Sequence, residues 1–390
     1  MVENKDKKVL NAPHLRFPEF GGEWEKIRLG DNCNILMCKR IMAAQTNTDC
    51  GVPFYKIGTI GGKADAYISK ELFDEYKMKY SFPRKGEVMI TCAGTVGKCI
   101  IYNGEDSYYQ DSNIVWIDNP NKVITNGFLY HSLCKVNWSY LNSTTIVRIY
   151  NDDLRNLKLY IPQHDEQKKI AKLFSLLDER IATQNKVIED LKKLKSAIAE
   201  RVYNCRTYQL YRIGDVIEQV SKRNNSMSID KVLSVSNKLG FINQSEQFED
   251  RIVASEDTSN YKIVYKDDFA YNPARINVGS IARLKHFNKG IVSPMYICFR
   301  VKQGIVLDYL EYFFTTNYFF YEMQKRLEGS VRQCLSFEGL CNIPIYIPNL
   351  DEQQKIGRKV SVIMEKIDNE NRYLDSLKMQ KQYLLRQMFI

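Results

Sequence analysis

Leu159-Tyr-Ile-Pro-Gln-His-Asp-Glu-Gln-Lys-Lys-Ile170 recurs 186 residues later as Ile345-Tyr-Ile-Pro-Asn-Leu-Asp-Glu-Gln-Gln-Lys-Ile356. Weaker echoes keep the same order: Arg28-Leu-Gly-Asp31 with Arg212-Ile-Gly-Asp215, Thr95-Val-Gly-Lys98 with Asn277-Val-Gly-Ser280, and Val147-Arg148 with Val331-Arg332. A repeat at a nearly fixed, long offset indicates one structural plan written twice. The length of 390 residues favours two or three domains, and the repeat divides it into two similar halves.

The charge of the chain follows the same division. Residues 1–204 carry 30 basic and 25 acidic side chains, and residues 205–390 carry 26 and 21, so each half contributes +5 to the total of +10. A basic excess suits an acidic partner such as nucleic acid. Its duplication suggests one DNA molecule held at two places.

A long segment with helical periodicity follows each copy of the junction motif. Asp165-Glu166 and Asp351-Glu352 place negative charge in the first turn of each segment, where the helix dipole favours it. The residues that recur in steps of three and four are Phe174, Leu177, Ile181, Gln184, Ile188, Leu191, Lys195, Ile198 and Val202 in the first segment, and Val360, Ile363, Ile367, Glu370, Leu374, Leu377, Lys381, Leu384 and Met388 in the second. This spacing is typical of a coiled coil.

Because the two stripes match, we expect the helices to pair with each other. An antiparallel pair would bring Ile188 near Leu374, at the centre of a pseudo-twofold axis. The alternative is that each amphipathic helix packs separately on its own domain.

The regions before the helices have a different pattern. They are rich in Tyr, Ile, Val and Phe in short runs broken by Gly, Asn, Asp and Pro, which is typical of strands. Strand-like runs are Val52-Pro-Phe-Tyr-Lys-Ile57, Glu87-Val-Met-Ile-Thr91, Ile114-Val-Trp-Ile117 and Tyr296-Ile-Cys-Phe-Arg-Val301, and short helices are expected at Phe128-Leu-Tyr-His-Ser-Leu133 and Tyr309-Leu-Glu-Tyr-Phe-Phe314. The predicted fold class is α+β: two tandem mixed domains, separated and followed by long helices.

This organisation resembles the specificity (S) subunit of Type I restriction-modification systems. The matching pieces are Pro13-His-Leu-Arg-Phe-Pro-Glu-Phe20 leading into Trp24-Glu-Lys-Ile-Arg-Leu-Gly-Asp31, the Ile-Pro-x-x-Asp-Glu-Gln-x-x-Ile junctions at 161–170 and 347–356, and the two long helices. The resemblance covers essentially the whole chain. Its junction motif is specific because it occurs twice, at the matching place in each half.

The resemblance implies a non-catalytic DNA-reading scaffold. Residues 1–162 and 205–348 would be target recognition domains, each reading one half of a split sequence in double-stranded DNA. Residues 163–204 and 349–390 would be spacer helices that dock two modification (methyltransferase) subunits and, in the full complex, two restriction subunits. No cofactor is expected on this chain, since S-adenosylmethionine would belong to the modification subunit, and ATP and Mg to the restriction subunit.

Candidate DNA contacts come from glycine-rich loops and polar side chains of the types that read bases and phosphates. Gly94 and Gly97 allow close backbone approach, and Arg275 and Asn277 suit bidentate readout of guanine and adenine. The candidates are Lys56, Thr59, Thr95, Lys98, Arg148 and Tyr150 in the first half, and Lys222, Arg223, Asn237, Lys238, Arg275, Asn277, Ser280, Arg332 and Gln333 in the second.

Enzymatic motifs are incomplete in this sequence. Asn272-Pro273 begins an amino-methyltransferase motif from which Ala274 and Arg275 depart, and no G-x-G-x-x-G or Walker A loop is present. Glu75-Tyr-Lys77 is better explained as a solvated helix face than as a nuclease site. The ten cysteines form no C-x-x-C pair, so we expect reduced thiols and no metal. We therefore expect no catalysis by this chain.

A second function remains open on residues alone: a coiled-coil assembly protein whose α+β units bind protein or glycan. No run approaches the ~20 apolar residues of a membrane span, and residues 1–8 lack the apolar stretch of a signal peptide. We expect a cytoplasmic protein with no membrane partner.

Overall fold

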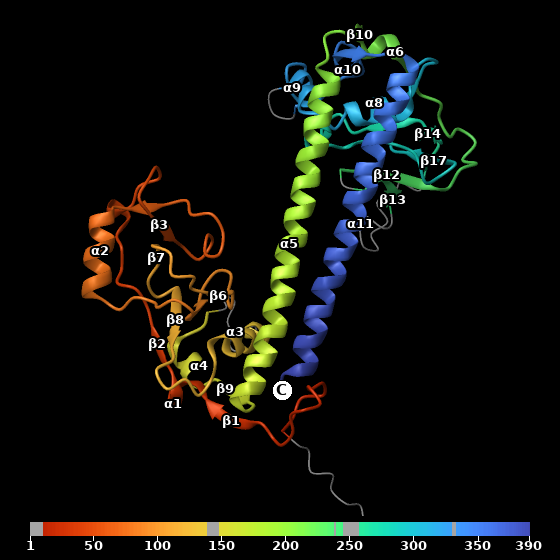
Figure 1. The fold of residues 1–390 in the computed structure, drawn as a ribbon. Coiled ribbons are helices and arrows are strands. Elements are labelled where there is room, and N and C mark those ends of the chain that lie inside the picture. Colours follow the sequence, from red (N-terminus) through yellow and green to blue (C-terminus); the bar gives the residue numbers. More distant parts are fainter. Residues whose placement is uncertain (1–10, 139–147, 238, 245–256, 330–332) are drawn as a thin grey trace, which may run out of the picture. The chain divides into compact units, whose positions relative to one another are not determined.

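The chain forms two compact units, the first comprising residues 1–184 and 373–390 and the second residues 185–372. A computed structural model describes residues 11–138, 148–237, 239–244, 257–329 and 333–390 (Figure 1). Two long helices, α5 (His164–Tyr203) and α11 (Leu350–Met388), each contribute to both units. The predicted mixed fold with two long helices is confirmed.

The first unit is built on a four-stranded antiparallel sheet with strand order β2-β8-β5-β6. A three-stranded sheet, β4-β3-β7, is formed by strands that lie between β2 and β8 in the chain, and β1 pairs with β9 immediately before α5. The strands are β1 (Glu25–Arg28), β2 (Asn34–Leu36), β3 (Val52–Tyr55), β4 (Tyr67–Ile68), β5 (Val88–Thr91), β6 (Cys99–Ile101), β7 (Tyr108–Tyr109), β8 (Ile114–Asp118) and β9 (Lys158–Ile161). The helices are α1 (Leu29–Asn32), α2 (Lys70–Lys79), α3 (Asn126–Lys135) and α4 (Asn151–Arg155), with a 3-10 turn η1 (Ala43–Gln45).

The second unit repeats this plan. Its sheet β11-β18-β15-β16 matches β2-β8-β5-β6 strand for strand, and β10 pairs with β19 as β1 pairs with β9. The strands are β10 (Gln209–Arg212), β11 (Ile217–Val220), β12 (Val232–Ser236), β13 (Gly240–Asn243), β14 (Lys262–Tyr265), β15 (Phe269–Tyr271), β16 (Ile281–Arg283), β17 (Lys289–Val292), β18 (Ile297–Val301) and β19 (Pro344–Ile347). The helices are α6 (Ile213–Val216), α8 (Leu307–Phe313), α9 (Asn317–Gln324) and α10 (Phe337–Cys341), with a 3-10 turn η3 (Ile276–Val278).

One parallel strand pair is also duplicated. β3 pairs in parallel with β7, and β12 pairs in parallel with β17, each within a sheet whose other pairings are antiparallel. The second unit adds β14 to the outer side of β17, giving the order β13-β12-β17-β14. The repeat in the sequence therefore corresponds to a repeat of strand topology, including the parallel strand pair.

In each unit, aromatic side chains join the end of a long helix to a short helix. In the first unit, Phe389 follows the end of α11 and stacks on Phe128 of α3, with 4.9 Å between ring centroids, and Trp24 meets both rings edge-on. In the second unit, Tyr203 at the end of α5 packs on Tyr309 of α8, with centroids 4.8 Å apart. Burial of such large rings dominates core energetics, so these rings anchor the end of α11 in the first unit and the end of α5 in the second.

The repeated Arg-x-Gly-Asp turns pack a glycine against a neighbouring short helix. A Cβ on Gly30 would lie 2.9 Å from the Cβ and the carbonyl oxygen of Arg155, and a Cβ on Gly214 would lie 2.9 Å from the Cβ of Cys341. Arg155 and Cys341 end α4 and α10 respectively. Glycine fits these turns because a Cβ would meet the backbone of Arg155 at Gly30 and mainly the side chain of Cys341 at Gly214.

Within each unit the long helices run antiparallel. In the first unit the start of α5 meets the end of α11, where Lys381 forms an ion pair with Asp178 and Arg180 lies 5.5 Å from the ring of Tyr373. In the second unit the end of α5, at Ala199 and Tyr203, shares a core with Ile356 and Val360 near the start of α11. The residues of the predicted stripe are buried or half-buried: Phe174, Leu177, Ile181, Gln184, Ile188, Leu191, Lys195, Ile198, Val202, Val360, Ile363, Ile367, Glu370, Leu374, Leu377, Lys381, Leu384 and Met388.

Candidate nucleic-acid interface

Three separate stretches of the first unit meet at the C-terminal ends of β3 and β5. The loop after β5 (residues 92–98) is tied to residues 148–150 by a hydrogen bond from the backbone N–H of Ile149 to the carbonyl of Cys92, at 2.9 Å. The Nζ of Lys98 donates to the carbonyl of Ile60, at 2.5 Å, which ties the same loop to the turn after β3. The sequence candidates of this half therefore form one surface.

Glycines set the shape of this surface. Gly94 and Gly97 have φ of 65° and 81°, the left-handed region that favours glycine. A Cβ on Gly97 would lie 2.1 Å from the indole of Trp138, and one on Gly94 would lie 2.7 Å from Ile57. The two glycines thus let the loop pack closely against Trp138 and Ile57.

The charged candidates on this surface already form contacts with other residues of the unit. Lys56 pairs with Asp65 at 3.0 Å, and Lys98 is held by Ile60. The guanidinium of Arg148 lies over the ring of Tyr150, 5.8 Å from its centroid, and Tyr150 is 59% exposed. Arg148 and Tyr150 therefore present a cation and an aromatic face together. Thr59 is fixed by the backbone N–H of Lys56, at 3.0 Å, and Thr95 is exposed, with its carbonyl accepting from the hydroxyl of Thr91.

The second unit brings the corresponding loops together. Asn237 follows β12, and the loop 272–280 follows β15; a Cβ on Gly279 would lie 3.9 Å from the Cβ of Asn237, so the two loops are neighbours. The backbone N–H of Leu335 donates to the carbonyl of Pro273, at 3.1 Å, just as Ile149 donates to Cys92. Asn237, Arg275 and Asn277 are exposed on this surface.

Other candidates of the second unit lie in different places. The hydroxyl of Ser280 is buried and donates to the carbonyl of Val235, at 3.0 Å, so it lies beneath the surface. Lys222 and Arg223 are exposed, and Arg223 forms a β-bridge with Lys262 at the start of β14, which lies two strands from β12 in the sheet. The guanidinium of Arg223 donates to the side chain of Asn260, at 2.9 Å. Gln333 is exposed. Lys238 and Arg332 lie outside the described residues.

The sequence alignment of the third stretch is two residues out of register. Hydrogen bonding equates Ile149 with Leu335. The helix caps agree, because Tyr150 is the N-cap of α4 and Ser336 is the N-cap of α10. The counterpart of Arg148 is therefore Cys334, whereas the pairing of Val147-Arg148 with Val331-Arg332 implied Arg332.

Gln110 belongs to the first surface and was missed from sequence. Its Oε1 accepts a hydrogen bond from the backbone N–H of Ile57, at 3.4 Å, and its own N–H donates to the carbonyl of Tyr55. The parallel pairing of β7 with β3 places it there. Parallel partners are distant in sequence, and nothing around Gln110 signals the contact.

Two of the buried thiols in these units are held in the protonated form. Burial raises the pKa of Cys92 to about 11 despite the neighbouring Arg148, and it raises the pKa of Cys298 to about 12. Among the described residues, no group of three or more His, Cys, Asp or Glu side chains is placed to hold a metal ion. No helix in the described part of the chain is long and apolar enough to cross a membrane.

Comparison with known proteins links both units to one family. A family model described as "Type I restriction modification DNA specificity domain" matches residues 21–193 and again residues 206–379. A putative type I restriction enzyme specificity subunit of Haemophilus influenzae is 48% identical over 165 residues, which is 42% of each chain. The type I restriction enzyme MjaVIII specificity subunit of Methanocaldococcus jannaschii is 24% identical over 418 residues, covering 98% of this chain and 95% of the relative.

Solved structures show the same fold. The S subunit of a Type-I restriction-modification system from M. genitalium superposes with a TM-score of 0.64 at 15% identity, covering 97% of this chain and 99% of that one. A structure described as the basis of complex assembly and conformational transition of the type I R-M system gives a TM-score of 0.51 at 15% identity, covering 93% and 96%.

Proposed function

The chain belongs to the Type I restriction modification DNA specificity domain family, and from that membership we propose that each of its units reads one half of a split DNA target. The observation that carries this proposal is the duplicated loop surface. In both units, the loops after the equivalent strands β3 and β12, and after β5 and β15, converge with the segment that precedes α4 or α10.

The chemistry of the surface suits a nucleic acid. It offers backbone amides at glycine turns, an arginine over a tyrosine at Arg148 and Tyr150, and exposed Arg275 and Asn277. Phosphates are bound by cations and amides, and bases are read by Arg and Asn. The different side chains at equivalent positions, such as Arg148 and Cys334, would let the two units read different sequences.

The other reading, a coiled-coil assembly protein with protein- or glycan-binding units, is not favoured. Both units match a DNA specificity domain, and the matches include most of α5 and α11. A non-DNA scaffold would not account for the two matches.

We assign α5 and α11 the roles of spacer and docking platform. The partners would be two modification subunits and, in the full complex, two restriction subunits. This chain would catalyse nothing and bind no cofactor, with S-adenosylmethionine on the modification subunit and ATP and Mg on the restriction subunit. The proposed location is the cytoplasm, where chromosomal DNA is accessible.

Methylome sequencing tests the proposal. The full chain is expressed with its modification subunit in a methylation-free host, and modified adenines are mapped on its DNA. We expect methylation within a sequence of two short specific parts separated by unspecific bases. Methylation at a single contiguous site, or at no site although the complex assembles, would contradict the bipartite reading.

A further inference from the structure

The carboxylate of Glu166, near the start of α5, forms an ion pair with the side chain of Arg16. The Nε and Nη2 of Arg16 donate to its two oxygens, both at 2.7 Å, and the carboxylate is fully buried. Arg16 also donates to the carbonyls of Gly21 and Gly22, at 2.9 and 2.6 Å. Residues 11–22, which we term the arm, thus form a looped segment held on the helix by a bidentate ion pair, and the loop is closed by a hydrogen bond from the backbone N–H of Trp24 to the carbonyl of Asn11, at 2.7 Å.

Two aromatic side chains of the arm also contact α5. The Nζ of Lys169, one turn along α5, lies 4.5 Å from the ring centroid of Phe17 and 5.9 Å from that of Phe20. The arm also reaches the end of α11, because the backbone N–H of Leu15 donates to the carbonyl of Gln387, at 2.9 Å. The first unit therefore shows which kind of peptide this helix start binds.

Glu352 holds the equivalent place on α11, but no arm reaches it in the part of the chain that the structure describes. By the offset of 184 that relates Arg28 to Arg212, the residues corresponding to 13–20 of the arm are 197–204, and nearly all of these form the end of α5. The side chain of Glu352 is 39% exposed, whereas that of Glu166 is 0% exposed. Its ion pair among the described residues is a long one, 3.9 Å to Lys355 on the same helix.

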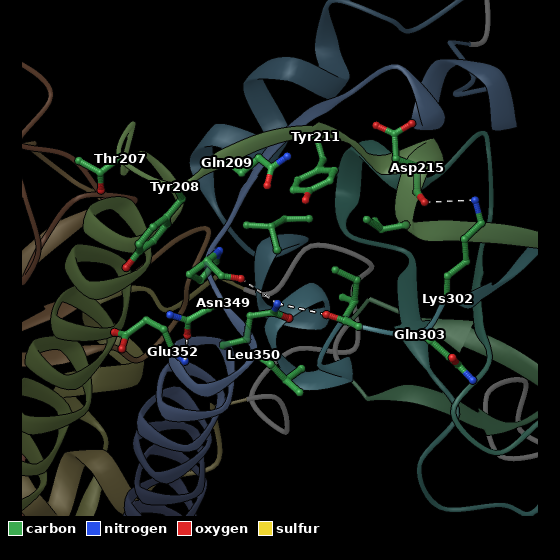
Figure 2. A pocket seen from close by; sticks show the side chains of 16 residues that line it. Thr207, Tyr208, Gln209, Tyr211, Asp215, Lys302, Gln303, Asn349, Leu350 and Glu352 are labelled. Atoms are coloured by element: carbon green, nitrogen blue, oxygen red, sulfur yellow. Dashed lines mark hydrogen bonds between the residues drawn. The ribbon is translucent and has the colours of Figure 1, made fainter.

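A cavity of about 820 Å³ lies at this place in the second unit. Figure 2 shows Tyr208 and Glu352 on one side of it and Asp215 and Lys302 on the other. The cavity is lined by two carboxylates, those of Glu352 and Asp215, and by one cation, Lys302. The Nζ of Lys302 already donates to the carbonyls of Gly214 and Asp215, both at 3.2 Å. Leu350, which is 49% exposed, adds an apolar edge. The cavity is therefore suited to a cation carried on a partly apolar segment.

We propose that this cavity receives an arginine-bearing segment of the modification subunit, whose arginine pairs with Glu352 as Arg16 of the arm pairs with Glu166. The choice of partner rests on the proposed function. A second copy of this chain is a poorer donor, because releasing its arm would leave Glu166 buried without its cation, which is strongly unfavourable. In the first unit the equivalent site is already occupied by the arm, so of the two sites among the described residues only that of Glu352 is open to a partner.

The first experiment uses a fluorescein-labelled peptide of residues 11–22 and the full chain, followed by fluorescence anisotropy. We expect saturable binding with one peptide per chain, weakened about tenfold to a hundredfold by Glu352→Gln in the chain and by Arg16→Ala in the peptide. The matched control is Glu365→Gln, an exposed carboxylate elsewhere on α11, which should leave binding unchanged. Equal binding to the Glu352→Gln chain, or no binding, would overturn the proposal. So would loss of binding in Glu166→Gln alone, because it would place the peptide at the first unit.

The second experiment identifies the partner. Native mass spectrometry of the chain with its modification subunit should show assembly weakened by Glu352→Gln and by excess peptide, but not by Glu365→Gln. Unchanged assembly, or Glu352-dependent pairing of two copies of this chain, would overturn the assignment to the modification subunit. DNA binding by the Glu352→Gln chain is measured in parallel. Retained DNA binding with unchanged assembly refutes this inference alone, whereas absent DNA binding in the unmodified complex refutes the proposed function.

Discussion

The side chain of Gln167 on α5 accepts a hydrogen bond from the backbone N–H of Thr125, with 2.7 Å between Oε1 and N. Thr125 is the N-cap of α3, so the amide closes one free donor at the start of that helix. The Nε2 of Gln167 donates to the carbonyls of Val123 and Pro162, at 3.1 and 3.0 Å. The buried side chain of Gln167 thus joins Val123 and Thr125, which precede α3, to the start of α5.

The second unit contains the same set of hydrogen bonds. Gln353 accepts from the backbone N–H of Val306, the N-cap of α8, at 2.8 Å, and donates to the carbonyls of Gly304 and Pro348, at 3.3 and 3.0 Å. This is the physical reason for the glutamine of the duplicated Asp-Glu-Gln motif.

Replacing either glutamine should loosen only its own unit. Gln167→Ala leaves the N–H of Thr125 and two carbonyls without partners, and we expect a loss of about 1–3 kcal/mol of unfolding free energy. Hydrogen exchange should accelerate at the amide of Thr125 and not at that of Val306, with the reverse for Gln353→Ala. Exposed Gln163→Ala is the control. Faster exchange at both amides in either variant would contradict the assignment.

Alanine at the two tight turns should destabilise the chain unequally. Gly30→Ala places a Cβ 2.9 Å from a backbone carbonyl oxygen, which cannot move away, whereas Gly214→Ala meets mainly the side chain of Cys341. We expect about 1–3 kcal/mol from such overpacking, with Gly30→Ala the more severe in urea unfolding. Gly21→Ala, which meets nothing within 4 Å, should have little effect. Equal stability of Gly30→Ala and the unmodified chain would refute the close packing.

Acid should destabilise the first unit through His131. Burial, helped by Lys381 and opposed by Asp178, lowers the pKa of this imidazole from 6.5 to about 4. The folded state therefore takes up the proton less readily than the unfolded state, and stability present above pH 6.5 is lost as the pH falls towards 4. The full loss is about 3 kcal/mol.

Unfolding measured from pH 7 to pH 4 checks this sign. His131→Phe should flatten the dependence, since Phe fits among Tyr130 and Phe174, which already pack on the ring. Exposed His14→Gln should leave the slope as it is. A slope unchanged in His131→Phe would assign the acid sensitivity to other groups.

Substitution at the second loop surface should affect one half-site only. Arg275→Ala or Asn277→Ala should cost about 1–3 kcal/mol in binding and relax base preference at one or two positions. Binding is measured with DNA libraries randomised in each half separately. Exposed Arg358→Ala on α11 is the control. Weakening that is uniform over all sequences would mean that these residues contact phosphates and not bases.

Local patterns predicted much of this fold. The long helices follow from heptad periodicity, and the short strands from β-branched runs between turns. The pairing of β3 with β7 and the role of Gln167 depend on partners distant in sequence, so no local pattern reports them. The same limit applies to the candidate surface: the burial of Ser280 and the engagement of Lys98 are set by tertiary contacts with Val235 and Ile60.

Domain exchange tests the central claim most directly. Residues 206–348 are replaced by the corresponding region of another family member, and the methylated sequence is mapped with the same modification subunit. If each unit reads its own half-site, one half of the methylated sequence changes and the other stays the same. A change in both halves, or in neither, would contradict the account.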